Sequence, residues 1–133
     1  MPEVTVSVRG QRPIPWGCKE WKWRGCISDE ASIVRRTKED MLPAAPQDIH
    51  FSVSLVFLMK PGSIEHADLD NLAKPVLDTL FKSRNAQGQG NELTGAMFDV
   101  DDDRVFHLIV EKKPVVGPED EGVDITIAWE DSR

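Results

Sequence analysis

The side chains best suited to chemistry in this chain are aspartates that form two groups well separated in the sequence. Asp68 and Asp70 lie one residue apart, and Lys74 follows four residues after the second aspartate. The other group is the acidic run Asp99–Asp103. Clustered carboxylates raise each other's pKa unless a cation lies among them, and ligation by oxygen alone favours Mg²⁺ or Mn²⁺ over zinc. The pattern predicts a metal-dependent phosphodiester hydrolase.

These aspartates have three alternative interpretations: a calcium-binding loop, a glycosyl transferase motif and a purely structural role. Asp99, Asp101 and Asp103 have the spacing that opens a calcium-binding loop, but the sixth position is Arg104 instead of glycine and the twelfth is Val110. Glycosyl transferases that bind nucleotide-sugar phosphates also carry an Asp-x-Asp pair, yet this chain lacks a recognisable nucleotide-binding βαβ unit. A third alternative is purely structural: the first group caps a helix and the second forms a polar turn before a strand.

The bulk composition is that of one soluble domain. A chain of 133 residues, 40% hydrophobic and 29% charged, is expected to form a single domain over residues 1–133. It contains no apolar run of the roughly 20 residues that a membrane span needs, and its start lacks the charged and apolar regions of a signal peptide. We therefore expect a cytoplasmic protein with no membrane partner.

The charge distribution bears on nucleic-acid binding. The net charge of −7 opposes the approach of phosphate, but residues 9–38 hold eight basic against three acidic side chains. Within residues 18–25, tryptophans alternate with basic residues, which is typical of a surface where bases stack and phosphates bind; the alternative is a hairpin edge whose tryptophans cover the core. The residues expected to contact DNA are Arg12, Lys19, Lys22, Trp23, Arg24 and Lys60.

Hydrophobic periodicity predicts an α+β fold. Alternation at period two indicates strands, a capping serine at Ser28 followed by acids indicates a helix as far as Leu42, and a second helix follows the Asp68 group. The longest strand, residues 49–59, is expected to be central and covered on both faces. The polar, glycine-rich segment 83–95 is expected to be a mobile loop. The order is β-α-β-α-β-β, a mixed sheet of about four strands with two main helices, the strands being residues 4–8, 49–59, 104–113 and 123–129.

The helix after Asp68 has two features that bear on the site. Proline is tolerated best in the first helical turn, so Pro75 predicts a helix cap at Asp70 or Asn71. Residues four apart lie on one helical face, which aligns Asp70, Lys74 and Asp78. We expect Lys74 to pair with Asp78 across one turn.

Taken together, the motifs resemble those of the RusA-type Holliday junction resolvases. That family's pattern is Asp-x-Asp-Asn-x-x-Lys-x-x-x-Asp-x-Leu, then a loop, then Asp-Asp-x-x-Val/Ile. The first part matches residues 68–80 and the second matches residues 101–105 at every specified position. Residues 10–15 are also similar to the Gly/Pro segment that many members carry after their first strand.

The resemblance implies a homodimer that binds branched, four-way DNA and cuts it symmetrically with Mg²⁺ or Mn²⁺. By position, the metal ligands would be Asp68, Asp70 and Asp102, with Asp101 close by, and Lys74 would be the essential lysine. The catalytic residues would be Asp68, Asp70, Lys74 and Asp102.

Two departures from the family pattern motivate other functions. Members often have basic residues directly before the Asp-x-Asp pair, where this chain has Ser-Ile-Glu-His-Ala at 63–67, and residues 82–98 form a long loop for the family. One alternative is a catalytically weak or inactive relative that serves as a DNA-binding or assembly module. Another is a metal-dependent enzyme acting on a small phosphate ester.

Overall fold

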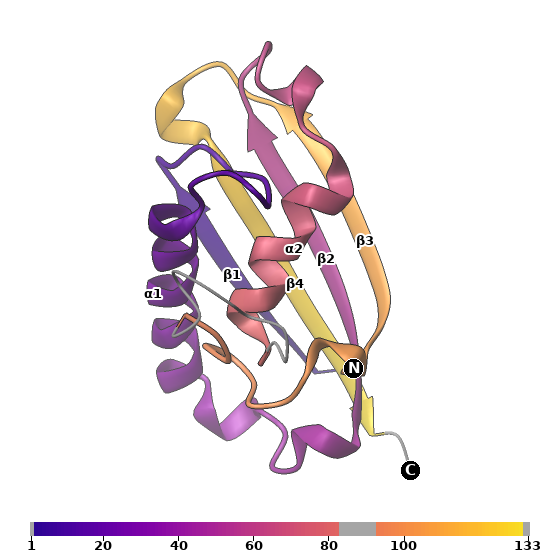
Figure 1. Cartoon of the computed structure of the whole chain (residues 1–133). Helices are drawn as coiled ribbons and strands as arrows, with labels where there is room; N and C mark the ends of the chain where they lie inside the picture. The colour runs from indigo at the N-terminus through magenta and orange to yellow at the C-terminus, as the bar shows by residue number, and fades with distance from the viewer. Residues whose placement is uncertain (1, 83–92, 132–133) are drawn as a thin grey trace.

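A computed structural model describes residues 2–82 and 93–131, and it forms one four-stranded sheet with two α-helices (Figure 1). The spatial order β1-β4-β2-β3 has β2 and β3 parallel and the other pairs antiparallel, so the sheet is mixed. The predicted α+β class and element order are confirmed; residues 83–92 of the predicted loop lie outside the described residues. The elements are β1 (Glu3–Arg9), α1 (Trp21–Thr37), β2 (Ile49–Met59), α2 (Leu69–Leu80), β3 (Val105–Pro114) and β4 (Gly122–Asp131).

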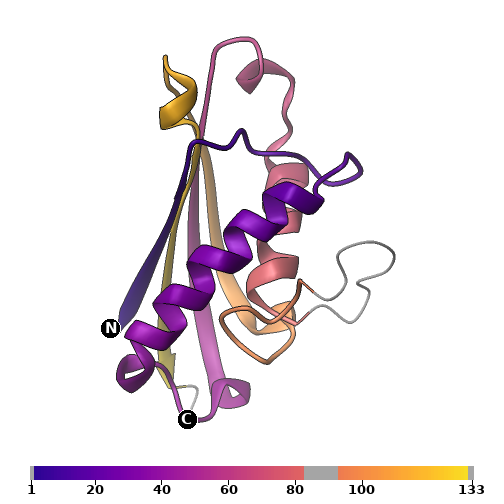
Figure 2. The same cartoon turned by 90° about the vertical axis from the view of Figure 1, so that its left-hand side faces the viewer.

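Both helices pack on the same face of the sheet (Figure 2). Along β2, Phe51, Val53 and the other odd-numbered residues are buried, whereas the even-numbered residues from His50 to Leu58 are only half-buried. The expectation that residues 49–59 are covered on both faces is therefore wrong. Since both α-helices cross the same side of the sheet, no helix of residues 2–82 and 93–131 covers the other side, and Ser52 and Ser54 lie there. Within the described residues, no helix is long and apolar enough to cross a membrane.

An aromatic cluster fixes the end of α2 to the sheet. The Phe51 ring lies 5.3 Å from the Phe81 ring and 4.5 Å from the Phe98 ring, measured between centroids. All three side chains are at most 3% exposed, and full burial of such a side chain contributes about 1.5–3 kcal/mol. Because Phe81 directly follows α2 and Phe98 precedes the second acidic group, this packing brings the two groups of the motif toward one another.

Helix α1 begins earlier than the sequence predicted. It spans Trp21–Thr37 instead of residues 28–42, and Ser28 lies in its middle. The helix starts after Glu20, whose carboxylate accepts a hydrogen bond from the Gly17 N–H at 3.0 Å. Trp23, Ile27 and Ala31, four residues apart, form its buried stripe. The cap-like residue types at 28–30 were misleading, because residues 21–27 already have a buried face at helical spacing.

Helix α2 also begins before its predicted start. Asp68 is the residue before the first turn, and Pro75 lies inside the helix. Pro75 has no N–H to donate to the Asn71 carbonyl. The Trp16 N–H, from the loop after β1, donates to that carbonyl at 2.7 Å instead. This external donor compensates for the proline, so the helix extends to Leu69 and the prediction of a cap at Asp70 or Asn71 is wrong.

Candidate functional site

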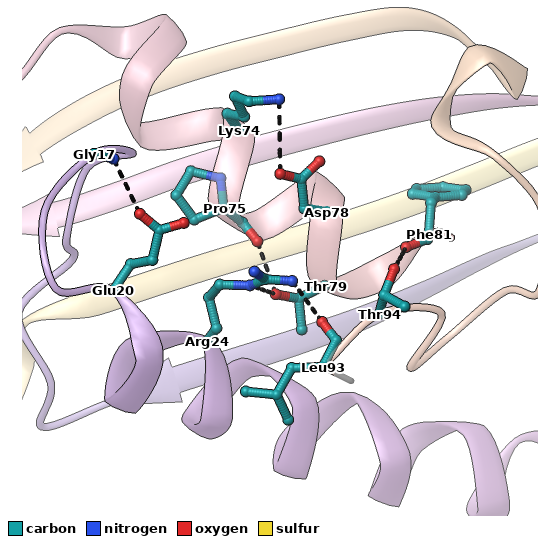
Figure 3. A network of polar contacts seen from close by, with 10 residues as sticks. All are labelled: Gly17, Glu20, Arg24, Lys74, Pro75, Asp78, Thr79, Phe81, Leu93 and Thr94. Carbon is teal, nitrogen blue, oxygen red and sulfur yellow. Dashed lines mark hydrogen bonds and ion pairs between the residues drawn. The ribbon is translucent and has the colours of Figure 1, made fainter. Parts of the chain in front are cut away.

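Helix α2 presents the lysine of the motif beside a buried carboxylate. Lys74 Nζ lies 3.7 Å from Asp78 Oδ2 (Figure 3), which confirms the predicted pairing. The Lys74 side chain is 46% exposed and that of Asp78 is 9% exposed. The ammonium also lies 5.7 Å from the centre of the Trp16 ring. The lysine is therefore held from two sides and still open to a ligand.

The second acidic group is anchored against the end of α2. The Lys82 N–H donates to the Val100 carbonyl at 2.8 Å, and Lys82 forms an isolated parallel bridge with Asp101. The Asp101 carboxylate accepts from the Asp103 N–H at 3.0 Å and so caps the short turn Asp102–Arg104. Arg104 Nε then donates to the Ile49 carbonyl at 3.0 Å, which ties this turn to β2.

Asp102 is the carboxyl that this arrangement perturbs most clearly. Partial burial, a hydrogen bond with the Asp101 side chain and the negative charges of Asp101 and Asp78 raise the pKa of Asp102 to about 6, while the nearby Lys74 ammonium lowers it. Residues from both groups of the motif, far apart in the sequence, thus interact in space.

A buried hydrogen-bond network lies beside this site and joins the two helices (Figure 3). The buried Arg24 guanidinium donates to Thr79 Oγ1 at 2.9 Å and to the Leu93 carbonyl at 2.6 Å. The Thr79 hydroxyl in turn donates to the Pro75 carbonyl at 2.8 Å. Because Thr79 is adjacent to Asp78 in α2, this network fixes the helix that carries the site.

The donor atoms of the site suit a hard cation, although they do not surround one point. Asp78 Oδ1 is buried without a hydrogen-bond partner in the described structure, and carboxylate oxygens are the ligands that Mg²⁺ prefers. Among the residues that the structure describes, no three His, Cys, Asp or Glu side chains form a group that could hold a metal ion. The carboxylate oxygens of Asp78, Asp101 and Asp102 therefore match Mg²⁺ in chemical type, although not in arrangement.

The structure divides the four predicted metal ligands into two groups. Asp68 and Asp70 are exposed at the start of α2, whereas Asp101 and Asp102 interact near its end. Asp70 and Asp78 are separated by a rise of about 12 Å along the helix. Since Mg²⁺ binds oxygen at about 2.1 Å, one ion cannot contact both. Lys74 lies between the two groups on the shared face.

Two of the six residues expected to contact DNA are inside the protein. Trp23 is 1% exposed and Arg24 is 5% exposed, so neither reaches the surface. The prediction is wrong for Arg24, whose guanidinium donates to Thr79 and Leu93 inside the protein, because the alternation of tryptophan and basic residues fits the period of a strand whereas the segment is helical. Trp23, although buried, borders the cavity described next. The other four, Arg12, Lys19, Lys22 and Lys60, line a single cavity.

Asp78 belongs to this site, and the sequence predicted it only as the partner of Lys74. Its spacing of four residues from Lys74 indicates the shared helix face, but its interaction with Asp102 depends on how the chain returns to α2 after residue 92.

No family model matches the chain, and a comparison with curated proteins found no match.

Proposed function

We propose that this protein is a Mg²⁺-dependent endonuclease that acts as a homodimer and cuts four-way DNA junctions. The observation that carries the proposal is the interaction of Asp102 with Asp101, Asp78 and Lys74. It joins the two parts of a motif that resembles the RusA-type resolvases. An exposed ammonium beside several carboxylates suits the binding of a metal together with a phosphate.

The proposal assigns a role to each group. Asp101 and Asp102, which lie near Asp78 at the end of α2, would supply oxygen ligands to a metal ion. The resemblance alone adds Asp68 and Asp70, and Asp70 lies too far along α2 from Asp78 to bind the same ion. A bound Mg²⁺ would polarise a phosphoryl oxygen and lower the pKa of a bound water. Lys74 would place a fixed positive charge against the phosphate as negative charge develops on it.

The role of Asp78 is to position Lys74. Its buried carboxylate restrains the lysine from one side and the Trp16 ring restrains it from the other. A lysine held in this way loses less conformational entropy when it binds a phosphate than a free one does.

The experiment uses an end-labelled four-way junction and a matched linear duplex, each with Mg²⁺ or Mn²⁺ and then with chelator. The wild-type protein should make paired cuts in the junction alone, and only with metal. Asp102→Asn and Asp70→Asn should each abolish cutting, whereas Asp99→Asn, at an exposed position, should not. If a folded, dimeric wild-type protein cuts neither DNA, the proposal fails.

A second candidate is a junction-binding module without nuclease activity. The exposed residues before Asp68 include Glu65 in place of basic side chains, and the net charge is −7, so phosphate contacts at this flank are few. Junction binding that persists in chelator without any cutting in metal would favour this function.

A further inference from the structure

A hollow of about 350 Å³ lies where the loop after β1, the start of α1, the end of β2 and the start of β4 meet. Four cationic side chains line it: Arg12, Lys19, Lys22 and Lys60. They come from three separate segments of the chain, which only the fold brings together. Trp23 and Glu121 also line the hollow.

The cations around this hollow form no ion pair with any residue that the structure describes. None of the four forms an ion pair within residues 2–82 and 93–131; the two ion pairs found there are Arg9–Asp124 and Lys74–Asp78. Glu121 is the one carboxylate among the described residues that line the wall. In a protein of net charge −7, four cations around one cavity, with no ion pair to the described residues, create a local site for an anion.

The walls of the hollow are well fixed. The Gly10 and Gln11 N–H groups donate to the Glu121 carbonyl at 2.8 and 3.3 Å. The Glu121 side chain is buried, and its Oε2 lies 3.5 Å from the Lys60 N. Because the backbone that carries Arg12 and Lys60 is held against Glu121, the cations start close to the arrangement that a ligand would need.

Trp23 supplies an unsatisfied donor in the same wall. Its side chain is 1% exposed, and Nε1 is buried without a hydrogen-bond partner in the described part of the chain. Buried donors are nearly always satisfied in folded proteins. An acceptor oxygen on a molecule in the hollow is one way to satisfy this one.

We propose that the hollow binds a backbone phosphate of a DNA strand, at a site separate from the carboxylates around Lys74. A volume of about 350 Å³ is roughly ten times the share of one water molecule in the liquid, which leaves room for a phosphate and an attached sugar. A second hollow of about 300 Å³ shares Arg12 and Ile14 with the first and extends to His66 and Ala67, next to Asp68. The two together form a path along which a strand can run toward the motif.

This inference rests on the proposed function, and binding in chelator tests it separately from cleavage. The probe is a short, fluorescently labelled single-stranded oligonucleotide, titrated at several salt concentrations. The test protein is Lys22→Gln with Lys60→Gln. The matched control is Lys38→Gln with Lys113→Gln, which removes the same charge at two exposed positions outside the hollow.

The double variant in the hollow should bind about tenfold more weakly, and the slope of log K against log salt should fall by about 1.4, because each lost contact with a single strand contributes about 0.7. The control should change the affinity less than threefold. The single variant Lys22→Gln, at an exposed position, should give half the change in slope and keeps the test available if the double variant does not fold. Equal losses in test and control would overturn the inference.

Free phosphate is the other source of the same chemistry. Inorganic phosphate, titrated alone into the wild-type protein, should bind more weakly than the oligonucleotide; tighter binding would assign the hollow to a small anion and overturn the DNA site. If oligonucleotide binding depends on the hollow but no junction is cut, the proposed function fails and this inference stands. If the junction is cut but oligonucleotide binding does not depend on the hollow, the proposed function stands and this inference fails.

Discussion

Replacing Asp102 with asparagine should stabilise the metal-free protein while removing its proposed activity. The raised pKa of Asp102, about 6 against an ordinary value of 3.8, means that the folded protein favours the neutral carboxyl over the carboxylate. Asparagine is neutral at every pH and nearly the same size. The substitution therefore removes the repulsion from Asp101 and Asp78 and leaves the turn in place.

The size of the effect follows from the difference in pKa. Each pKa unit corresponds to about 1.4 kcal/mol, which gives an upper limit of about 3 kcal/mol. Asp102 is only partly buried and solvent screens its charge, so we expect about 1–2 kcal/mol. Neutral Asp102 contributes its full stability below the ordinary pKa of 3.8 and loses it as the pH rises through about 6. The gain from the substitution should follow the same pH range.

The assay is urea unfolding in chelator, with the wild type and Asp102→Asn compared from about pH 4 to about pH 7.5. The free energies of unfolding should coincide at the acid end and separate as the pH rises, with the variant the more stable. Asp99→Asn, at an exposed position three residues earlier, serves as the control and should show no such pH dependence. A variant that is less stable than the wild type at neutral pH would refute the argument.

Three further substitutions test the structure around the site. Arg24→Ala should cost about 2–4 kcal/mol in urea unfolding, since Thr79 and Leu93 lose a buried donor; the exposed Arg36→Ala should cost about 0.5 kcal/mol or less, and equal costs would contradict the network. Lys74→Gln should move the titration of Asp102, followed by carbon NMR, to higher pH, because Lys74 lowers that pKa; an unchanged midpoint would show that the two groups do not interact. Gly122→Ala forces a methyl carbon into the Val8 carbonyl oxygen and should destabilise by about 3 kcal/mol or more, whereas Gly25→Ala in α1 meets no atom within 4 Å and should stabilise slightly; similar effects of the two would argue against the β1–β4 pairing.

Most helices and strands were predictable because the hydrophobic residues of each recur at the period of a helix or a strand and form one buried face. Residues 49–59 alternate strictly, and β2 occupies that range. The start of α1 was missed because its first turn mixes tryptophan and basic residues, which fit a half-buried strand as well as a helix. The choice between helix and strand depends on contacts with β1 and α2, and these contacts cannot be inferred from the local sequence.

The candidate site was predictable along one helix and not across the fold. The spacing of Lys74 and Asp78 determines their pairing, and the structure has it. The effect of Asp78 on Asp102 depends on the packing of Phe98 against Phe51, a contact between distant parts of the chain. The compensation of Pro75 by the Trp16 N–H is of the same kind, because a donor from another segment cannot be inferred from the helix alone.

The central claim is that the carboxylates around Lys74 form a metal-dependent nuclease site, and the most direct test is single-turnover cleavage of a labelled four-way junction in Mg²⁺. The wild type should cut, Lys74→Gln and Asp102→Asn should each lose at least about a hundredfold in rate, and Lys113→Gln, a lysine at an exposed position of β3, should cut as the wild type does. Cleavage that survives both site substitutions, or that continues in chelator, would contradict the claim.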